Sequence, residues 1–155
     1  MTKLTDKQFF IQLGEEISDK IRTRTRKGKD IDGKKFKKLS PSYKKAKKAF
    51  KNLVGPKQTS KKVNPTDLQY TGDMLRDLQV RSSSDESVTI GWTGSMATRV
   101  YQNEDNGRFM SKTNKPVNND EQKHIEQRLD ARINKSVDKE IDNIIANKKN
   151  LHIKL

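Results

Sequence analysis

The sequence has no cysteine, one tryptophan and few aromatic residues. Without cysteine it can form neither disulfide bonds nor thiolate metal sites, which is compatible with synthesis in a cytosol. No apolar run approaches the roughly 18 residues that span a bilayer. Acidic residues interrupt the N-terminal stretch where a signal peptide needs a continuous apolar segment. We therefore expect neither a leader nor a membrane partner.

Hydrophobic residues are also scarce, at 30% of 155 residues against 35% charged residues. The length suits a single domain over residues 1–155. The composition is polar for a self-sufficient globule, although it is not that of a fully disordered chain. We therefore expect a small core, supplemented by oligomer contacts or by flexible parts. The expected flexible parts are a basic loop and helix at about 27–66 and a C-terminal tail at 147–155.

Positive charge is abundant and concentrated in one segment. The chain has a net charge of +14, and residues 20–62 hold 18 Lys and Arg against Asp30 and Asp32, a net charge of +16. Such a block attracts phosphate or an acidic protein surface, with a strength that falls as salt rises. A solvated surface that only keeps the protein soluble is the competing interpretation, and the sequence favours neither.

Two helices are predicted before residue 56. Thr5 and Gln8 form a capping box, and an apolar stripe predicts a helix from about Asp6 to Arg26 that stops near Gly28. The members of that stripe are Phe10, Leu13, Ile17 and Ile21. Ser40 and Pro41 are typical of a second helix start, with Gly55 and Pro56 at its end. Phe36 and Leu39 are expected to anchor the intervening loop on the core.

The second helix has a predicted apolar face and a predicted basic remainder. The apolar face consists of Tyr43, Ala46, Phe50 and Leu53. Its lysines should then point away from the core, together with the arginines near the end of the first helix. We expect these bases to face DNA or an acidic neighbour: Arg22, Arg24, Arg26, Lys44, Lys45, Lys47, Lys48 and Lys51.

The stretch "LQYTGDMLRDLQVRSSSDESVTIGW", residues 68–92, predicts a short helix followed by a β-hairpin. Thr71 is the expected cap of a helix that carries Met74, Leu75 and Leu78. Alternation predicts strands at 78–83 and 87–92. Leu78, Val80 and Ser82 should share one face of the first strand, and Val88, Ile90 and Trp92 one face of the second. A hairpin alone is marginally stable and needs helices on its apolar side. The predicted fold class is α+β, a small antiparallel sheet at about 78–92 packed by an N-terminal helix and a long C-terminal helix.

The remaining sequence predicts one short and one long helix. Met96, Val100 and Tyr101 indicate the short one, and residues 104–116 indicate a loop, or an arm received by another subunit. Asn118 or Asn119 should cap a helix over about 120–146. Its apolar stripe recurs every fourth residue and winds about 40° per step around the helix. The stripe consists of Ile125, Leu129, Ile133, Val137, Ile141 and Ile145.

The sequence offers only weak candidates for catalytic, metal-binding or base-stacking residues. His124 and His152 have no second ligand at metal spacing, and both are expected to be exposed and without function. Asp73 and Asp77 share a helix face, but pairing with a neighbouring arginine and capping explain them better than catalysis does. Trp92 fits a core anchor better than a stacking platform for a base. We expect no enzyme, cofactor, metal site or small-molecule substrate.

The order of features from about residue 8 to 110 resembles the virion-morphogenesis and tail-completion proteins of tailed phages, the neck-forming group that includes the Mu-type morphogenesis protein. That family shows an N-terminal helix, an aromatic residue before a Leu-Ser-Pro helix start, and a Thr-Gly pair before a short helix and strand. A strand closing on Val or Ile and Gly follows, and then a helical tyrosine. The matching residues are Phe36, Leu39, Ser40, Pro41, Leu68, Thr71, Gly72, Leu75, Val88, Ile90, Gly91 and Tyr101.

The resemblance implies a structural virion protein, made in the host cytoplasm and located in the neck or tail region. It implies a homo-oligomeric ring that joins head and tail, a hexamer favoured over a dodecamer. Other neck and tail proteins are the implied partners, with packaged DNA as a further one.

Two other classes remain open. A basic nucleic-acid-binding protein of ribosomal or nucleoid type is supported by charge alone. A small hydrolase or nuclease would need a divalent metal held by Asp73 and Asp77.

Overall fold

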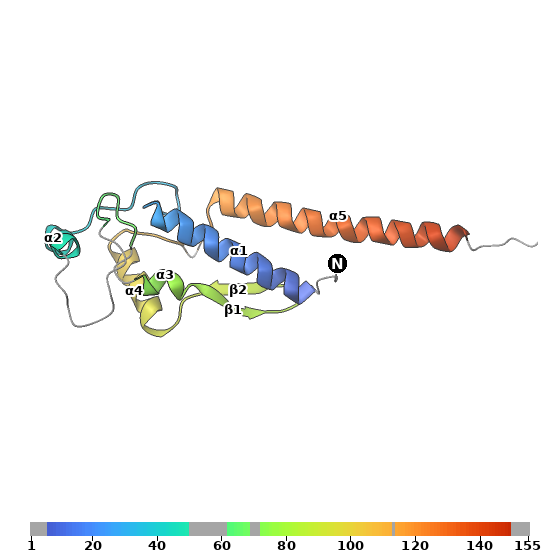
Figure 1. Cartoon of the computed structure of the whole chain (residues 1–155), viewed down its shortest axis with the longest axis horizontal. Helices are drawn as coiled ribbons and strands as arrows, with labels where there is room; N and C mark the ends of the chain where they lie inside the picture. Colours follow the sequence, from blue (N-terminus) through green and yellow to red (C-terminus); the bar gives the residue numbers. More distant parts are fainter. Residues whose placement is uncertain (1–5, 50–61, 69–71, 113, 150–155) are drawn as a thin grey trace, which may run out of the picture. The chain divides into compact units, whose positions relative to one another are not determined.

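The computed structural model describes residues 6–49, 62–68, 72–112 and 114–149. The chain divides into two compact units, residues 1–121 and residues 122–155, each of which is described by itself. The first unit contains helices α1 to α4, a two-stranded antiparallel sheet and the first residues of α5. The predicted α+β class with a small hairpin, an N-terminal helix and a long C-terminal helix is therefore confirmed (Figure 1).

Helix α1 spans Asp6–Arg26, the bounds that its apolar stripe predicts. Leu13, Ile17 and Ile21 are buried, as expected. The buried stripe begins at Phe9, however, whereas Phe10 lies half-buried with its ring edge-on to that of Phe9. The helix ends before Gly28, which has a positive φ of 78° that favours glycine. Thr5 of the predicted capping box lies outside the described residues.

Strands β1 (Gln79–Ser83) and β2 (Val88–Gly91) form the predicted hairpin. Val80 pairs with Ile90, but the register then shifts, so that Ser82 pairs with Thr89 and Ser83 with Val88. This bulge turns Ser82 to the exposed side, so the prediction that it shares the face of Val80 is wrong. A bulge inserts one residue into a strand, and strict alternation cannot foresee it.

Helix α1 packs on both strands of the hairpin. The contact is close at Gly14, where a Cβ atom would lie 2.7 Å from Val88 Cγ2 and 2.8 Å from Val80 Cγ2. A glycine at this position lets the helix backbone approach the sheet. The interior glycine therefore serves helix–sheet packing.

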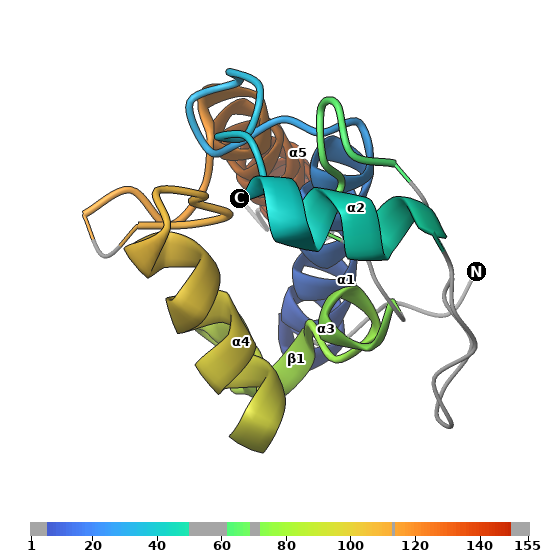
Figure 2. The same ribbon diagram turned by 90° about the vertical axis from the view of Figure 1, so that its left-hand side faces the viewer.

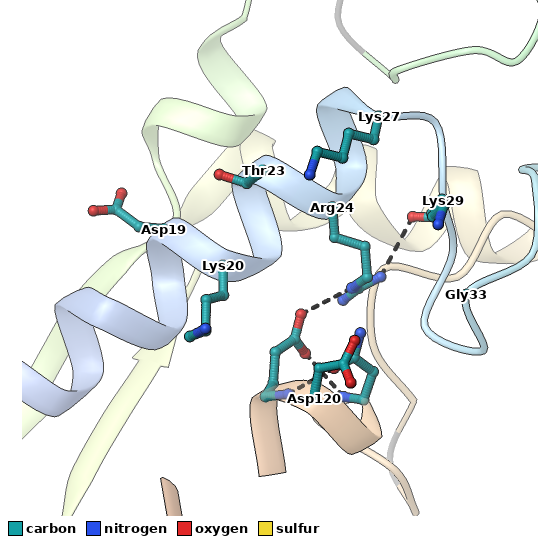
Figure 3. A pocket seen from close by; sticks show the side chains of 10 residues that line it. Asp19, Lys20, Thr23, Arg24, Lys27, Lys29, Gly33 and Asp120 are labelled. Atoms are coloured by element: carbon teal, nitrogen blue, oxygen red, sulfur yellow. Dashed lines mark hydrogen bonds and ion pairs between the residues drawn. The ribbon is translucent and has the colours of Figure 1, made fainter. Parts of the chain in front are cut away.

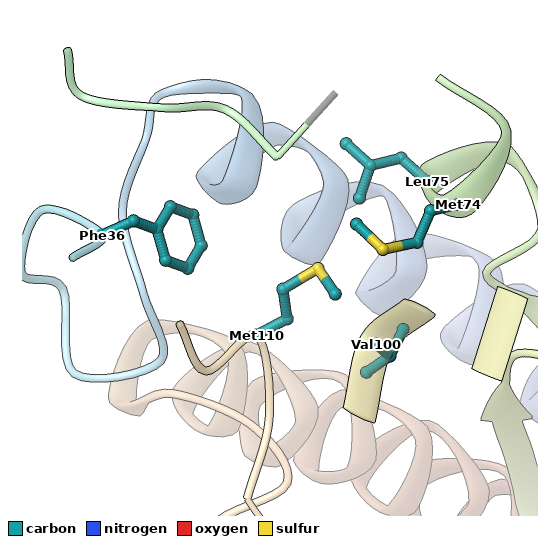
Figure 4. Packing of buried hydrophobic residues seen from close by; sticks show 5 residues of the cluster. All are labelled: Phe36, Met74, Leu75, Val100 and Met110. Atoms are coloured by element: carbon teal, nitrogen blue, oxygen red, sulfur yellow. The ribbon is translucent and has the colours of Figure 1, made fainter. Parts of the chain in front are cut away.

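A second hydrophobic cluster joins parts of the first unit that are distant in sequence. Its buried members are Phe36, Met74, Leu75, Val100 and Met110, whose side chains point toward one another in Figure 4. They come from the loop after α1, from α3 (Asp73–Arg76), from α4 (Gly94–Asp105) and from the loop after α4. The expected roles of Phe36 and Leu75 as core residues are confirmed.

The segment after α4 is a loop that packs on its own unit. Met110 is fully buried, and the Phe109 carbonyl accepts a hydrogen bond from the Ile31 amide at 2.9 Å. Arg108 donates from Nε to the Lys37 carbonyl at 2.9 Å and from Nη2 to the Lys38 carbonyl at 2.8 Å. The loop therefore fastens the segment between α1 and α2.

Helix α2 spans Pro41–Ala49 and lies beyond the C-terminal end of α1, away from the hairpin (Figures 1 and 2). Its predicted start is confirmed, because Ser40 Oγ accepts a hydrogen bond from the Tyr43 amide at 3.4 Å. Phe50, Lys51 and Leu53 lie outside the described residues.

Helix α5 spans Asn119–Lys149, so it includes residues 147–149 of the predicted tail. Of the two candidate caps, Asn118 is the one observed. Asn118 Oδ1 accepts from the Glu121 amide, and Glu121 Oε2 accepts from the Asn118 amide, both at 2.8 Å. This is a reciprocal capping box. Packing of α5 on the hairpin stays a prediction. Within the described ranges, no helix combines the length and apolar character needed to cross a membrane.

Candidate interaction surface of the basic segment

Arg22, a member of the predicted basic patch, is an internal anchor. Its Nε donates to the Leu75 carbonyl at 3.0 Å, and its Nη2 donates to the Leu78 carbonyl. These carbonyls lie at α3 and just before β1, so the guanidinium joins α1 to the short helix and the hairpin. Cations near the end of a helix stabilise its unsatisfied carbonyl groups. The outward orientation expected of Arg22 is wrong.

Arg24 is a second internal anchor. Its side chain is 7% exposed, and Nε lies 2.8 Å from Oε1 of Glu121, whose side chain is 2% exposed. Nη1 donates to the Lys29 carbonyl at 3.4 Å (Figure 3). Nη2 donates to the Met110 carbonyl at 2.8 Å. One guanidinium thus ties α1 to the capping box of α5 and to two loops. Its predicted outward orientation is also wrong.

Lys47 corrects the predicted face of α2. Its side chain is 1% exposed, and Nζ lies 2.8 Å from Oδ1 of Asp67, whose side chain is 6% exposed. Tyr43, placed on the buried face by the sequence pattern, is 46% exposed, and Ala46 is exposed as well. Four methylene groups of a lysine can be buried like an apolar side chain when the ammonium meets a carboxylate. Helix α2 is therefore anchored by an ion pair.

The remaining bases of the segment form an outward surface. Arg26, Lys45 and Lys48 are exposed as predicted, and Lys44 is half-buried. Further exposed lysines lie at the end of α1 and on the loop before α2. They are Lys20, Lys27, Lys29, Lys34, Lys35, Lys37 and Lys38. We call Arg26, Lys45, Lys48 and these lysines the outward basic surface.

Asp32 is one of the two acids that interrupt this surface. Its carboxylate lies 2.6 Å from Lys112 Nζ and 3.1 Å from Lys115 Nζ, on the loop after α4. Hydrogen bonds from Lys112 and then Lys115 lower the pKa of Asp32 to about 2. Asp32 therefore stays charged at neutral pH and connects the loop between α1 and α2 to the loop after α4.

An open pocket of about 370 Å³ lies beside Arg24 (Figure 3). Lys20, Lys27 and Lys29 line it together with Asp120 and Glu121. Its charges are mixed, and Arg24 and Glu121 already bind each other. The pocket holds no arrangement of a nucleophile and a base, so its visible role is the junction between α1 and the start of α5.

The two carboxylates considered as catalytic candidates, Asp73 and Asp77, make structural contacts. Asp73 pairs with Arg76. Asp77 accepts a hydrogen bond from the Thr93 amide at 2.7 Å and pairs with Arg81 at 2.9 Å. Partial burial acts to raise the pKa of Asp77, but the bonds from Thr93 and Arg81 outweigh it and lower that pKa below its usual value. The two carboxylates thus have different partners.

Trp92 is a core anchor, as expected. Its Nε1 donates to the Met74 carbonyl at 2.8 Å, and its ring packs against the cluster around Met110. His124 is half-buried rather than exposed, and His152 lies outside the described residues. In the part of the chain that the structure describes, no three acidic or histidine side chains gather into a group that could hold a metal ion.

The residues that match the phage family occupy defined positions. Pro41 begins α2, Gly72 precedes α3 with a positive φ of 81°, and Gly91 ends β2. Tyr101 lies on α4 and is 65% exposed. Thr71 lies outside the described residues, so its predicted capping role stays a prediction.

Sequence reasoning missed Asp67, Glu121 and Arg108 as anchors. Asp67 is the only acid between Asp32 and Asp73, in a stretch rich in lysine. That isolation was a usable signal for a buried partner. The Asn118-x-x-Glu121 spacing was a second signal, because it matches a capping box. Arg108 had no comparable signal, since its partners are backbone carbonyls.

Comparison with protein families, with curated proteins and with solved structures gave no match for this chain.

Proposed function

We propose that the protein is a structural component of a tailed-phage neck, which completes the tail or joins it to the head as one subunit of a ring. The ordered set of motif residues between about residues 8 and 110 carries this proposal. Phe36 and Leu75 share one cluster, although they lie 39 positions apart in sequence. Ser40 caps α2, and Ile90 pairs with Val80 in the hairpin.

In this proposal the outward basic surface contacts packaged DNA or an acidic face of a neighbouring subunit. Its support is the separation of the bases into two groups. Arg22, Arg24 and Lys47 hold the fold together, whereas Arg26, Lys45 and Lys48 are exposed. Exposed like charges repel each other, and an external anion relieves that repulsion.

The test removes the protein from the phage that encodes it. The proposal predicts DNA-filled heads and separate tails, seen by electron microscopy, and restoration of joined particles by the wild-type chain supplied in trans. A chain with a frameshift near its start, expressed from the same plasmid, is the matched control. Joined, infectious particles without the protein would contradict the proposal.

The proposal assigns the protein no catalytic step. Its support is that Asp73 and Asp77 are engaged with Arg76, Thr93 and Arg81. Purified protein should hydrolyse neither nucleic acid nor phosphate esters with Mg²⁺ or Mn²⁺ present. Metal-dependent hydrolysis that Asp73→Asn abolishes while the fold stays intact would overturn this assignment.

A nucleic-acid-binding protein of nucleoid or ribosomal type is the second candidate, favoured by the exposed lysines alone. It predicts a monomer that binds free duplex DNA or RNA and dissociates as salt rises. The neck proposal predicts instead that the protein enters particles in a fixed copy number, which mass spectrometry of purified particles measures.

A further inference from the structure

Helix α5 exposes a row of large aliphatic side chains. Ile133, Val137, Ile141, Ile144 and Ile145 are each between 48% and 58% exposed. Spacings of three and four residues place them on one side of the helix, and we call this row the apolar ridge. Scattered exposed apolar residues are normal, but a contiguous row is typical of a contact surface.

Charges along α5 are sorted around this ridge. At about 100° per residue, Asp130, Asp138 and Glu140 fall on the ridge or at its margins. Asp130 precedes Ile133 by three positions, and Glu140 lies four positions before Ile144. The bases of the same stretch, Arg132, Lys135 and Lys139, fall on the opposite side, where Asp142 is the one acid among them. The ridge is therefore apolar with an acidic margin, and two ridges in contact would set acids against acids.

The first unit carries the complementary surface on α2. The outward side of that helix presents Tyr43, Ala46 and Ala49, spaced three residues apart and all exposed. Lys45, also exposed, continues the same side next to Ala49, whereas Lys48 lies on the far side of the helix from Ala46 at about 100° per residue. This surface is apolar with a basic margin, and its two alanines leave room for branched side chains. Residues 1–121 contain 26 Lys and Arg against 15 Asp and Glu, so the surroundings are also positive.

We propose that the apolar ridge of one copy docks on the outward side of α2 in a second copy. The isoleucines contact Tyr43 and the alanines, while Lys45 faces the acids of the ridge. Because the two surfaces differ, every subunit keeps one free ridge and one free α2, and the contact repeats head to tail. The inference rests on the proposed function for closure into a ring, and the contact itself is testable in solution.

The test uses two variants that each lose one surface. The ridge variant carries Val137→Ser and Ile141→Ser, and the α2 variant carries Tyr43→Ser and Lys45→Glu. All four positions are exposed, and circular dichroism checks that both variants stay folded. Light scattering coupled to size-exclusion chromatography measures mass at concentrations up to several hundred micromolar. We expect oligomers from wild type and monomers from each variant alone.

The decisive sample is an equimolar mixture of the two variants. The intact ridge of the α2 variant can bind the intact α2 of the ridge variant, so the mixture should form a dimer that extends no further. An oligomer formed by the α2 variant alone would mean that ridges pair with ridges and would overturn the proposal. A monomeric wild type, or a mixture that stays monomeric, would overturn it equally.

Charge reversal supplies a second readout that leaves the apolar residues intact. Lys45→Glu, and separately Asp138→Lys with Glu140→Lys, should each weaken self-association at least tenfold. Mixing the two should restore pairing between them, and absence of any such rescue would refute the charge match. If the contact forms in solution but ridge variants still yield joined particles, the contact stands but joining does not use it, and only removal of the protein decides the neck function.

Discussion

Replacing Lys47 by methionine tests the buried ion pair of α2 most sharply. The change keeps most of the aliphatic stem and removes the ammonium that lies 2.8 Å from Asp67. The carboxylate, 6% exposed, then loses its buried cation. Breaking a buried ion pair by removing one partner costs about 3–5 kcal/mol. At about 2–4 °C per kcal/mol, the melting temperature should fall by roughly 6–20 °C.

The assay is urea unfolding followed by far-UV circular dichroism and by the fluorescence of Trp92, the single tryptophan. Lys48→Met on the same helix is the matched control, because Lys48 is exposed and should change the free energy of unfolding by less than about 0.5 kcal/mol. Adding Asp67→Asn to Lys47→Met should recover part of the loss, since no buried charge is then left uncompensated. If Lys47→Met unfolds like Lys48→Met, the ion pair does not anchor α2.

Two further predictions concern α1 and the loops. Gly14→Ala should destabilise the fold by about 1–3 kcal/mol, although alanine has the better helix propensity. The reason is that the added Cβ would meet the stiff side chains of Val80 and Val88. Adding Val88→Ala should relieve the loss in the same urea assay. Asp32 should titrate near pH 2 in carbon-detected NMR. Its contribution to stability is therefore present above about pH 4 and is lost as pH falls toward 2. A titration midpoint near pH 4 would mean that Lys112 and Lys115 do not bind the Asp32 carboxylate.

Periodicity located the helices and strands of this chain well. The stripe of α1, the Ser40-Pro41 start of α2 and the alternation of β1 and β2 are local signals, and the structure follows them. Local signals failed where a distant residue decided the outcome. Helix α2 is short and rich in lysine, so its buried side is set by Asp67, which lies 20 positions after Lys47.

For the same reason, the sequence predicted where the basic segment lies but not which of its bases face outward. A count of charge finds the basic segment, but it cannot distinguish a base that binds carbonyls inside the fold from one that faces water. Arg22 and Arg24 differ from Arg26 chiefly through partners that lie 53 to 97 positions away. Such contacts depend on the tertiary fold, and Leu75 carries no local mark of its contact because the acceptor is its backbone carbonyl.

The most direct test of the account reverses the charge of the outward bases and leaves the anchors unchanged. The outward variant replaces three exposed bases by glutamate: Arg26, Lys45 and Lys48. The matched control reverses three exposed bases outside the basic segment: Lys7, Lys135 and Lys139. Both variants should unfold within about 0.5 kcal/mol of wild type, because exposed substitutions change stability little. In the phage that encodes the chain, the outward variant should give heads and tails that do not join or do not retain DNA, while the control gives normal particles. A normal count of infectious, DNA-filled particles from the outward variant would show that the basic surface serves only solubility.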